Sequence, residues 1–214
     1  MPDFRSLEIK YMVRELRDSL VGGKFQKVYQ YGAGEKSFLF DVYVSTKGSF
    51  LLCSDEEKMF ITRRRREAPE TPPNFCMLLR KYLEGAYIKD IRQLGFDRIV
   101  EIETDGCILI FEFVPPGNVI LCDSFRNIIV PLSSQRWKDR SVLPKAPYVP
   151  PPSGYNPYAM SSEAFARTAS SAGEEKMAAF LAKMGFGPTY AGEICALCGI
   201  DCARPAGGSR ARSR

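Results

Sequence analysis

The chain has 214 residues, of which 45% are hydrophobic and 26% charged, and 30 Lys and Arg against 25 Asp and Glu give a formal net charge of +5. This balance is typical of a globular protein with a buried core, and the length suits one large domain or one domain with a small appendix. The sequence contains no histidine. Ser-His and Cys-His nucleophile pairs, histidine general bases and histidine metal ligands are therefore excluded.

The seven cysteines are mostly embedded in apolar runs, and their odd number is atypical of a disulfide framework. They follow no leader with the order of a secretion signal. The longest apolar stretch, residues 107–114, is interrupted by Glu112 and is far shorter than the roughly 20 residues that cross a bilayer. We therefore expect a cytoplasmic protein with reduced thiols and no membrane partner.

The first 149 residues predict two helices among many strands. Ser6 is the expected N-cap of a helix whose apolar residues recur at helical spacing as far as Gly22. Short β-branched and aromatic runs then predict an antiparallel meander over residues 24–31, 36–44, 49–54 and 58–63. Pro72 and Pro73 begin a second helix that ends at Gly85. Further strands are expected over residues 87–94, 98–103, 107–114, 119–122 and 128–130.

A change in composition divides the chain. Residues 149–154 are rich in proline, and beyond them β-branched residues become scarce while alanine becomes common. We predict an α+β protein with a β-rich sandwich-like domain over residues 1–149, a Pro-rich linker over 150–160 and a small all-α domain over 161–204. Residues 205–214 are expected to form a disordered basic tail.

The helical region contains the pattern of a helix-hairpin-helix motif in residues 181–194, with Gly185 and Gly187 flanking Phe186. Glycines allow close approach of a backbone, and the N–H groups at the start of the second helix favour an anion. We assign phosphate contact to Gly185 and Gly187. The alternative is a plain helical hairpin that only packs.

Four consecutive cations, Arg63, Arg64, Arg65 and Arg66, follow the fourth predicted strand. They are candidates for binding an RNA backbone, and Arg80 and Lys81 of the second helix are assigned the same contact. The alternative is a solvated turn, as for most runs of charge. Arg210, Arg212 and Arg214 of the tail would add attraction without sequence preference.

Cys195, Cys198 and Cys202 have a spacing that invites a metal interpretation. A tetrahedral zinc site needs a fourth ligand, and this spacing on a helix is also ordinary core spacing. We expect no metal and no cofactor.

The N-terminal Met1-Pro2-Asp3 supports an enzymatic alternative. Removal of Met1 would expose the amine of Pro2, the nucleophile that DNA glycosylase/lyases of the formamidopyrimidine type use. Those enzymes have Glu after the proline and a four-ligand zinc finger, and this sequence has neither.

Six segments between residues 5 and 202 carry a resemblance to a known family: residues 13–16, 21–30, 72–83, 95–100, 116–123 and 190–195. Among them, PPNFCMLLRKYL and GFDRIV are the most specific. The segments resemble the N-terminal part of the NFACT family, ribosome quality-control proteins that include RqcH, NEMF and Caliban and were long described as fibronectin-binding-like. The resemblance implies a β-rich domain shaped like the N-terminal domain of formamidopyrimidine-DNA glycosylase, followed by a helix-hairpin-helix domain.

The resemblance also implies a function in the rescue of stalled ribosomes. Members of the family bind the obstructed large ribosomal subunit with its peptidyl-tRNA, recruit charged tRNA and support mRNA-independent tailing of the nascent chain, mainly with alanine in bacteria. The ribosome performs the peptidyl transfer, so the chain is expected not to be an enzyme. The family's Asp-Arg pair, implicated in engaging tRNA, falls on Asp97 and Arg98, and a further acidic position falls on Glu8, where the family usually has Asp.

Two family regions, the long coiled coil and the NFACT-R domain, are not matched by this sequence. Contacts that those regions make are therefore not expected of this chain. The older description of the family leaves a fibronectin-binding adhesin as another alternative.

Overall fold

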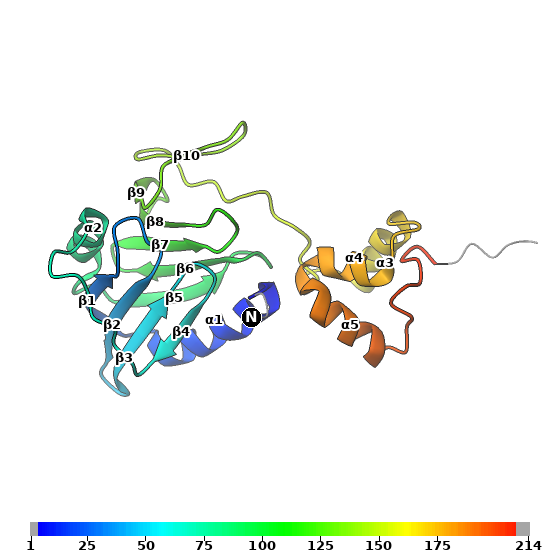
Figure 1. Ribbon diagram of the computed structural model, residues 1–214, viewed down its shortest axis with the longest axis horizontal. Helices are drawn as coiled ribbons and strands as arrows, with labels where there is room; N and C mark the ends of the chain where they lie inside the picture. Colours follow the sequence, from blue (N-terminus) through cyan, green and yellow to red (C-terminus); the bar gives the residue numbers. More distant parts are fainter. Residues whose placement is uncertain (1–3, 209–214) are drawn as a thin grey trace, which may run out of the picture. The chain divides into compact units, whose positions relative to one another are not determined.

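The computed structural model describes residues 4–208, which form two compact units (Figure 1). The larger unit contains Phe4 and residues 8–94 and 98–151, and the smaller contains residues 5–7, 95–97 and 152–208. The larger unit carries both sheets, and the smaller carries the three C-terminal helices. Within residues 4–208, no helix is long and apolar enough to cross a membrane.

The larger unit is an α+β fold with antiparallel sheets, as the predicted α+β class with antiparallel strands requires. A four-stranded sheet has the sequential order β1 Lys24–Gln30, β2 Phe38–Val44, β3 Gly48–Ser54 and β4 Met59–Thr62. A five-stranded sheet has the order β5 Ile88–Gln93, β6 Ile99–Thr104, β7 Cys107–Glu112, β8 Asn118–Asp123 and β9 Ile128–Pro131. Two short strands, β10 Gln135–Arg136 and β11 Ser141–Val142, pair with each other. The helices are α1 Ser6–Leu20, which begins at the expected N-cap itself, and α2 Asn74–Leu83.

The two sheets and both helices share one core. In β2, alternate residues from Phe38 to Val44 point into it, as the period of a half-buried strand requires. A β-bulge between Phe25 and Lys27 of β1 allows Phe25 and Val28 to face the same core. Edge-to-face contacts then join the layers: Phe40 with Phe111 of β7 at 6.0 Å between ring centroids, and Phe38 with Phe75 of α2 at 5.9 Å.

The five-stranded sheet is buried on its second face as well, under the segment that includes Val142 and Tyr148. The carboxylate of Glu101 is fully buried there and accepts a hydrogen bond of 2.8 Å from Arg92 Nε and further bonds from Arg126. Glu112 accepts from Arg140 and from the Tyr148 hydroxyl at 2.8 Å. A buried charge is tolerated only when it is paired and hydrogen-bonded, so Arg126 and Arg140 hold their loops to the sheet.

The smaller unit is a helical hairpin with a third helix. Its elements are α3 Ser162–Ser171, α4 Met177–Leu181, the π-helical turn η1 Ala182–Phe186 and α5 Gly187–Leu197. The Ser161 hydroxyl caps α3 by accepting from the Ala164 N–H at 3.2 Å. A small core around Phe180, Met184 and Cys195 holds the helices together.

Part of the segment expected to be disordered is hydrogen-bonded. Ala206 N–H donates to Glu175 O at 2.7 Å, and Gly207 N–H donates to Gly173 O at 3.0 Å. The prediction of a tail beginning at residue 205 is therefore wrong for residues 205–208, because their backbone pairs with the α3–α4 connection. Arg210, Arg212 and Arg214 lie outside the described residues.

We predict that Phe40→Ala lowers the free energy of unfolding by about 3–5 kcal/mol, since it removes a fully buried ring between the sheets. Tyr43→Ala, on the same strand but 46% exposed, is the control and should change it by no more than about 0.5 kcal/mol. Urea denaturation of both variants gives the comparison. Equal losses would contradict the shared core.

A second prediction concerns alkaline pH. Burial raises the pKa of the Cys122 thiol from 9.0 to about 12, so the folded state keeps a proton that the unfolded chain releases above about pH 9. The stability contributed by this thiol is complete below pH 9 and falls as pH rises, by about 2 kcal/mol at about pH 10.5. The urea midpoint should therefore fall between about pH 8 and pH 10.5, and this fall should be smaller in Cys122→Ala than in the parent. An equal fall in both proteins would contradict the raised pKa of Cys122.

Candidate nucleic-acid interface

The turn between β5 and β6 carries the predicted pair Asp97 and Arg98. Leu94 N–H donates to Ile99 O at 3.0 Å and closes the turn. Phe96 is buried against Tyr158 and Phe186, with ring centroids 5.3 and 5.7 Å away. This aromatic anchor fixes the backbone immediately before the pair.

Arg98 lies in the larger unit and lines a cavity of about 150 Å³. Its carbonyl accepts from Phe113 N–H at 2.8 Å, which ties β6 to the end of β7. The other lining residues are Lys36, Glu56, Glu57, Phe113, Pro115, Pro116 and Gly117. Lys36 Nζ donates to Pro116 O, so two cations face one small cavity beside two exposed carboxylates. The mixture suits a ligand that presents both an anion and hydrogen-bond donors.

Asp97 belongs to the smaller unit and binds the start of its longest segment. The Ser153 hydroxyl donates to Oδ2 at 2.6 Å, and Gly154 N–H donates to Oδ1 at 3.2 Å. Asp97 therefore holds the chain at residues 153–154.

Glu8 lies in the first turn of α1 and is half-buried. A carboxylate at this position stabilises the helix through its dipole. The structure thus supplies a structural reason for Glu8, and its predicted contact with tRNA stays a prediction.

The arginine run follows β4 and is exposed throughout. Arg65 donates to the Tyr29 hydroxyl at 2.9 Å and to Asp41 Oδ2 at 2.8 Å, and the hydrogen bond from Arg65 to Asp41 raises the pKa of Arg65. The Arg66 guanidinium lies 4.5 Å from the centroid of the Tyr31 ring. Arg65 and Arg66 are thus placed on tyrosines of the first sheet, an arrangement not predicted from the sequence, although Tyr29 and Tyr31 alternate there.

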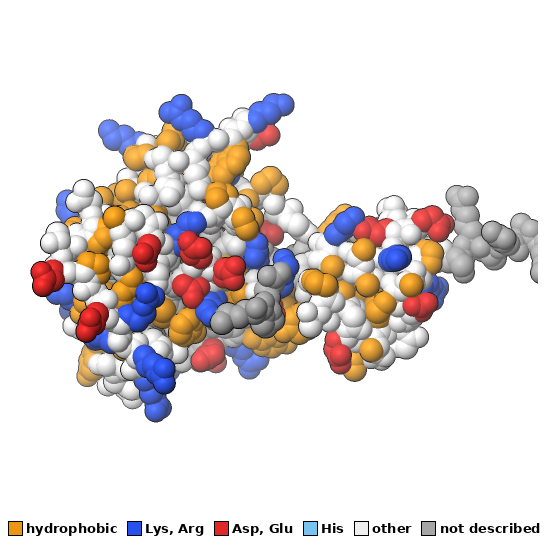
Figure 2. Space-filling model, viewed as in Figure 1, with side chains coloured by type: hydrophobic (Ala, Val, Ile, Leu, Met, Phe, Trp, Pro, Cys, Tyr) orange, Lys and Arg blue, Asp and Glu red, His pale blue; other side chains and the backbone are white. Residues whose placement is uncertain are grey.

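The two predicted cations of α2 differ. Arg80 Nε donates to Val28 O at 2.8 Å and lies 3.6 Å from Glu84 Oε1, so Arg80 ties α2 to β1. Lys81 is exposed, with Nζ 5.6 Å from the Tyr82 ring centroid. Over the face of the larger unit shown in Figure 2, basic and acidic side chains are interspersed.

Gly185 and Gly187 form the turn between α4 and α5, and both have positive φ, 96° and 73°. A Cβ on Gly185 would lie 2.8 Å from the Phe96 ring, and one on Gly187 would lie 3.1 Å from Arg5 Cγ. The Gly187 N–H donates to Ala182 O within the hairpin. Backbone geometry and packing therefore explain both glycines without a ligand.

The three C-terminal cysteines have different environments: Cys195 is buried, Cys202 is half-buried and Cys198 is exposed. In the part of the chain that the structure describes, no group of three or more Cys, Asp or Glu side chains is arranged to hold a metal ion. Pro2, the candidate nucleophile of the glycosylase alternative, lies outside the described residues.

Comparison with known proteins establishes the family. Residues 6–211 match the family described as NFACT N-terminal and middle domains, so the chain belongs to the NFACT family. The archaeal Rqc2 homolog aRqcH of Methanocaldococcus jannaschii is 32% identical over 213 residues, which cover 93% of this chain and 32% of that protein. The Rqc2 homolog RqcH of Bacillus subtilis is 34% identical over 158 residues, 66% of this chain and 27% of that protein. The chain thus spans about a third or less of the length of these relatives.

Solved structures share the fold. The N-terminal domain of the fibronectin-binding protein PavA from Streptococcus pneumoniae superposes with a TM-score of 0.81 at 28% identity, covering 92% of this chain and 80% of that one. The N-terminal part of the fibronectin/fibrinogen-binding protein from Streptococcus suis gives 0.82 at 29% identity, covering 94% and 82%. The α+β architecture is therefore common to these proteins.

We predict that Asp97→Ala speeds hydrogen exchange of the Gly154 amide about threefold to tenfold, because a hydrogen bond is worth about 0.5–1.5 kcal/mol. Asp123→Ala is the matched control, since that carboxylate accepts from Phe125 and Asn127 in the larger unit. It should leave Gly154 unchanged. Native-state exchange measured by NMR checks both, and an unchanged rate in Asp97→Ala would show that its carboxylate does not hold this segment.

Proposed function

We propose that this chain is the RNA-binding N-terminal part of a ribosome quality control factor. In this function it binds the obstructed large ribosomal subunit and its tRNA, in the cytoplasm, and supports rescue and mRNA-independent C-terminal tailing, with alanine as the expected residue. The observation that carries the proposal is the family match over residues 6–211, together with relatives named as Rqc2 homologs and as a ribosome quality control complex subunit in Saccharomyces cerevisiae.

The proposed tRNA contact centres on Arg98 and Asp97. A guanidinium holds a phosphate with two parallel hydrogen bonds or stacks on an exposed base, and a carboxylate accepts from a base edge or a 2′-OH. Arg98 lines a cavity with a second cation, Lys36, which supports an anionic ligand there. Glu8 is proposed as a further acceptor.

The proposed contacts with the RNA backbone include Arg63, Arg64 and Lys81, which are exposed. The guanidinium groups of Arg65 and Arg66 lie against tyrosine rings. Their positive charges still add to the attraction for phosphate. The helix-hairpin-helix turn at Gly185 and Gly187 is proposed to approach phosphate through its backbone. In this function the chain supplies binding and orientation, and the ribosome supplies the peptidyl transfer.

The names of the solved relatives favour a second candidate function, the binding of fibronectin. The two functions separate in one experiment, in which the same purified chain is presented to immobilised fibronectin and to aminoacylated tRNA. Binding to fibronectin alone would replace the proposal.

We predict that Arg98→Ala weakens binding of aminoacylated tRNA at least about tenfold, because a hydrogen bond to a charged group is worth about 1.5–3 kcal/mol. Arg98→Lys keeps the charge without the planar fork and should bind with intermediate affinity. Lys138→Ala removes an equal charge from an exposed position outside the proposed contact and should change Kd by less than about twofold. Filter binding over a salt series measures all three, and isolated large subunits are titrated in parallel. Equal affinities for Arg98→Ala and Lys138→Ala would overturn the assignment of Arg98.

A further inference from the structure

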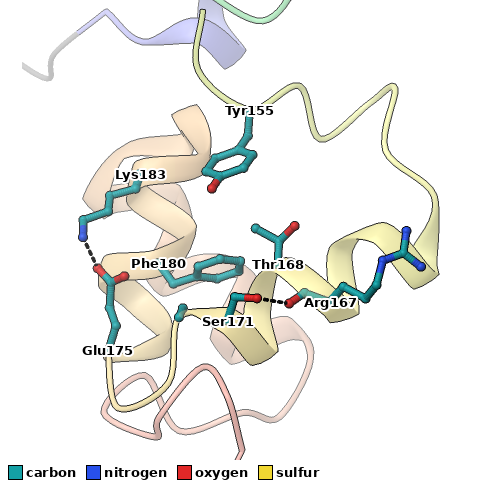
Figure 3. A pocket seen from close by; sticks show the side chains of 8 residues that line it. Tyr155, Arg167, Thr168, Ser171, Glu175, Phe180 and Lys183 are labelled. Atoms are coloured by element: carbon teal, nitrogen blue, oxygen red, sulfur yellow. Dashed lines mark hydrogen bonds and ion pairs between the residues drawn. The ribbon is translucent and has the colours of Figure 1, made fainter.

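A second cavity lies in the smaller unit, and its lining includes none of Asp97, Arg98 and Glu8. It has a volume of about 390 Å³, within the range of about 300–1,000 Å³ typical of small-molecule sites. Its walls are α3, the α3–α4 connection, α4 and the π-helical turn, with Tyr155 from the Pro-rich segment. Figure 3 shows the Tyr155 ring on one side of the space, with the Phe180 ring and Thr168 also lining it.

The interior of this cavity offers hydrogen-bond acceptors. Thr168 Oγ1 donates its proton to Ala164 O at 2.9 Å, and Ser171 Oγ donates to Arg167 O at 3.0 Å. Each hydroxyl has one proton and two lone pairs, so both oxygens present lone pairs to a ligand. The carboxylate of Glu175 adds further acceptors. A ligand that fits must therefore donate hydrogen bonds.

The border of the cavity has the opposite character. Lys183 and Arg167 are exposed cations on opposite sides of the space (Figure 3), and Lys183 Nζ lies 2.6 Å from Glu175 Oε1. The Tyr155 ring is 48% exposed and stands beside the cavity, whereas Phe180 is 4% exposed and forms part of its floor. An aromatic ring next to cations is the arrangement on which unpaired bases stack while their phosphates are held.

We infer that this cavity binds one unpaired RNA nucleotide whose base carries an exocyclic amino group, as adenine does. The base stacks on Tyr155, its amino group donates to Thr168 Oγ1 or Glu175, and the adjoining phosphates lie near Arg167 and Lys183. The inference deepens the proposed RNA-binding function and rests on it for the class of ligand. It assigns a base-binding role to the helical unit that is separate from phosphate contact at Gly185 and Gly187.

The test uses the whole chain and a fluorescent oligoadenylate, with oligouridylate of equal length as the comparison, since uracil has no exocyclic amino group. Anisotropy titrations should show tighter binding of oligoadenylate. Tyr155→Ala should raise its Kd about fivefold to a hundredfold, the usual range for losing one stacking ring, and Tyr155→Phe should restore it to within about twofold. Phe125→Ala, which removes an 84% exposed ring from the larger unit, is the matched control and should have no effect.

Thr168→Val tests the amino-group contact, because it keeps the shape of the side chain and removes the acceptor. It should reduce the preference for oligoadenylate over oligouridylate. Equal binding of the two oligomers by the parent chain, or an unchanged Kd in Tyr155→Ala, would overturn the inference. If adenosine monophosphate binds as tightly as oligoadenylate, the cavity is a mononucleotide site and the inference of an RNA site is wrong.

The same variants are titrated with aminoacylated tRNA so that the two proposals fail separately. Dependence of tRNA binding on Arg98 without dependence of oligoadenylate binding on Tyr155 would overturn the cavity and leave the proposed function. Oligoadenylate binding that depends on Tyr155, without tRNA or large-subunit binding, would support the cavity and overturn the proposed function.

Discussion

The edge-to-face contact between Phe40 and Phe111 joins two sheets that come from different parts of the chain. Neither sheet could bury its inner face alone, because a single antiparallel sheet leaves that face in water. Once the faces meet, the positions of α1 and α2 follow, since both helices add apolar side chains to the same core. The β-bulge in β1 belongs to this constraint, because it keeps Phe25 and Val28 on the buried side.

The five-stranded sheet is also covered on its second face, and this cover buries two carboxylates that must be paired. Glu101 and Glu112 lie inside this cover, and each needs charged partners. Arg92 of β5 supplies one for Glu101. Arg126 and Arg140 provide the others from loops, which ties those loops to the sheet. The end of β7 is held by a backbone hydrogen bond, which the Phe113 N–H donates to the Arg98 carbonyl. Arg98 is therefore anchored to the five-stranded sheet.

In the smaller unit, function and packing compete for the same residues. Gly185 and Gly187 suit close approach to a phosphate, yet Phe96 and Arg5 already occupy the space where a side chain would extend. Asp97 likewise accepts a structural hydrogen bond from Ser153 and is also a proposed ligand contact. When these residues are substituted, a change in RNA binding can therefore be interpreted only if the stability of the variant is measured as well.

Local signals in the sequence determined much of this protein: the helices and strands, the antiparallel fold class, the family and the adjacency of Asp97 and Arg98, because periodicity, turn residues and motifs are properties of neighbouring positions. Tertiary structure alone decided which distant residues meet. It brought Lys36 and Phe113 to Arg98, placed Arg65 on Tyr29, and set Tyr155 of the Pro-rich segment over the cavity beside Thr168. Such pairings arise from the packing of whole elements, and no local pattern encodes them.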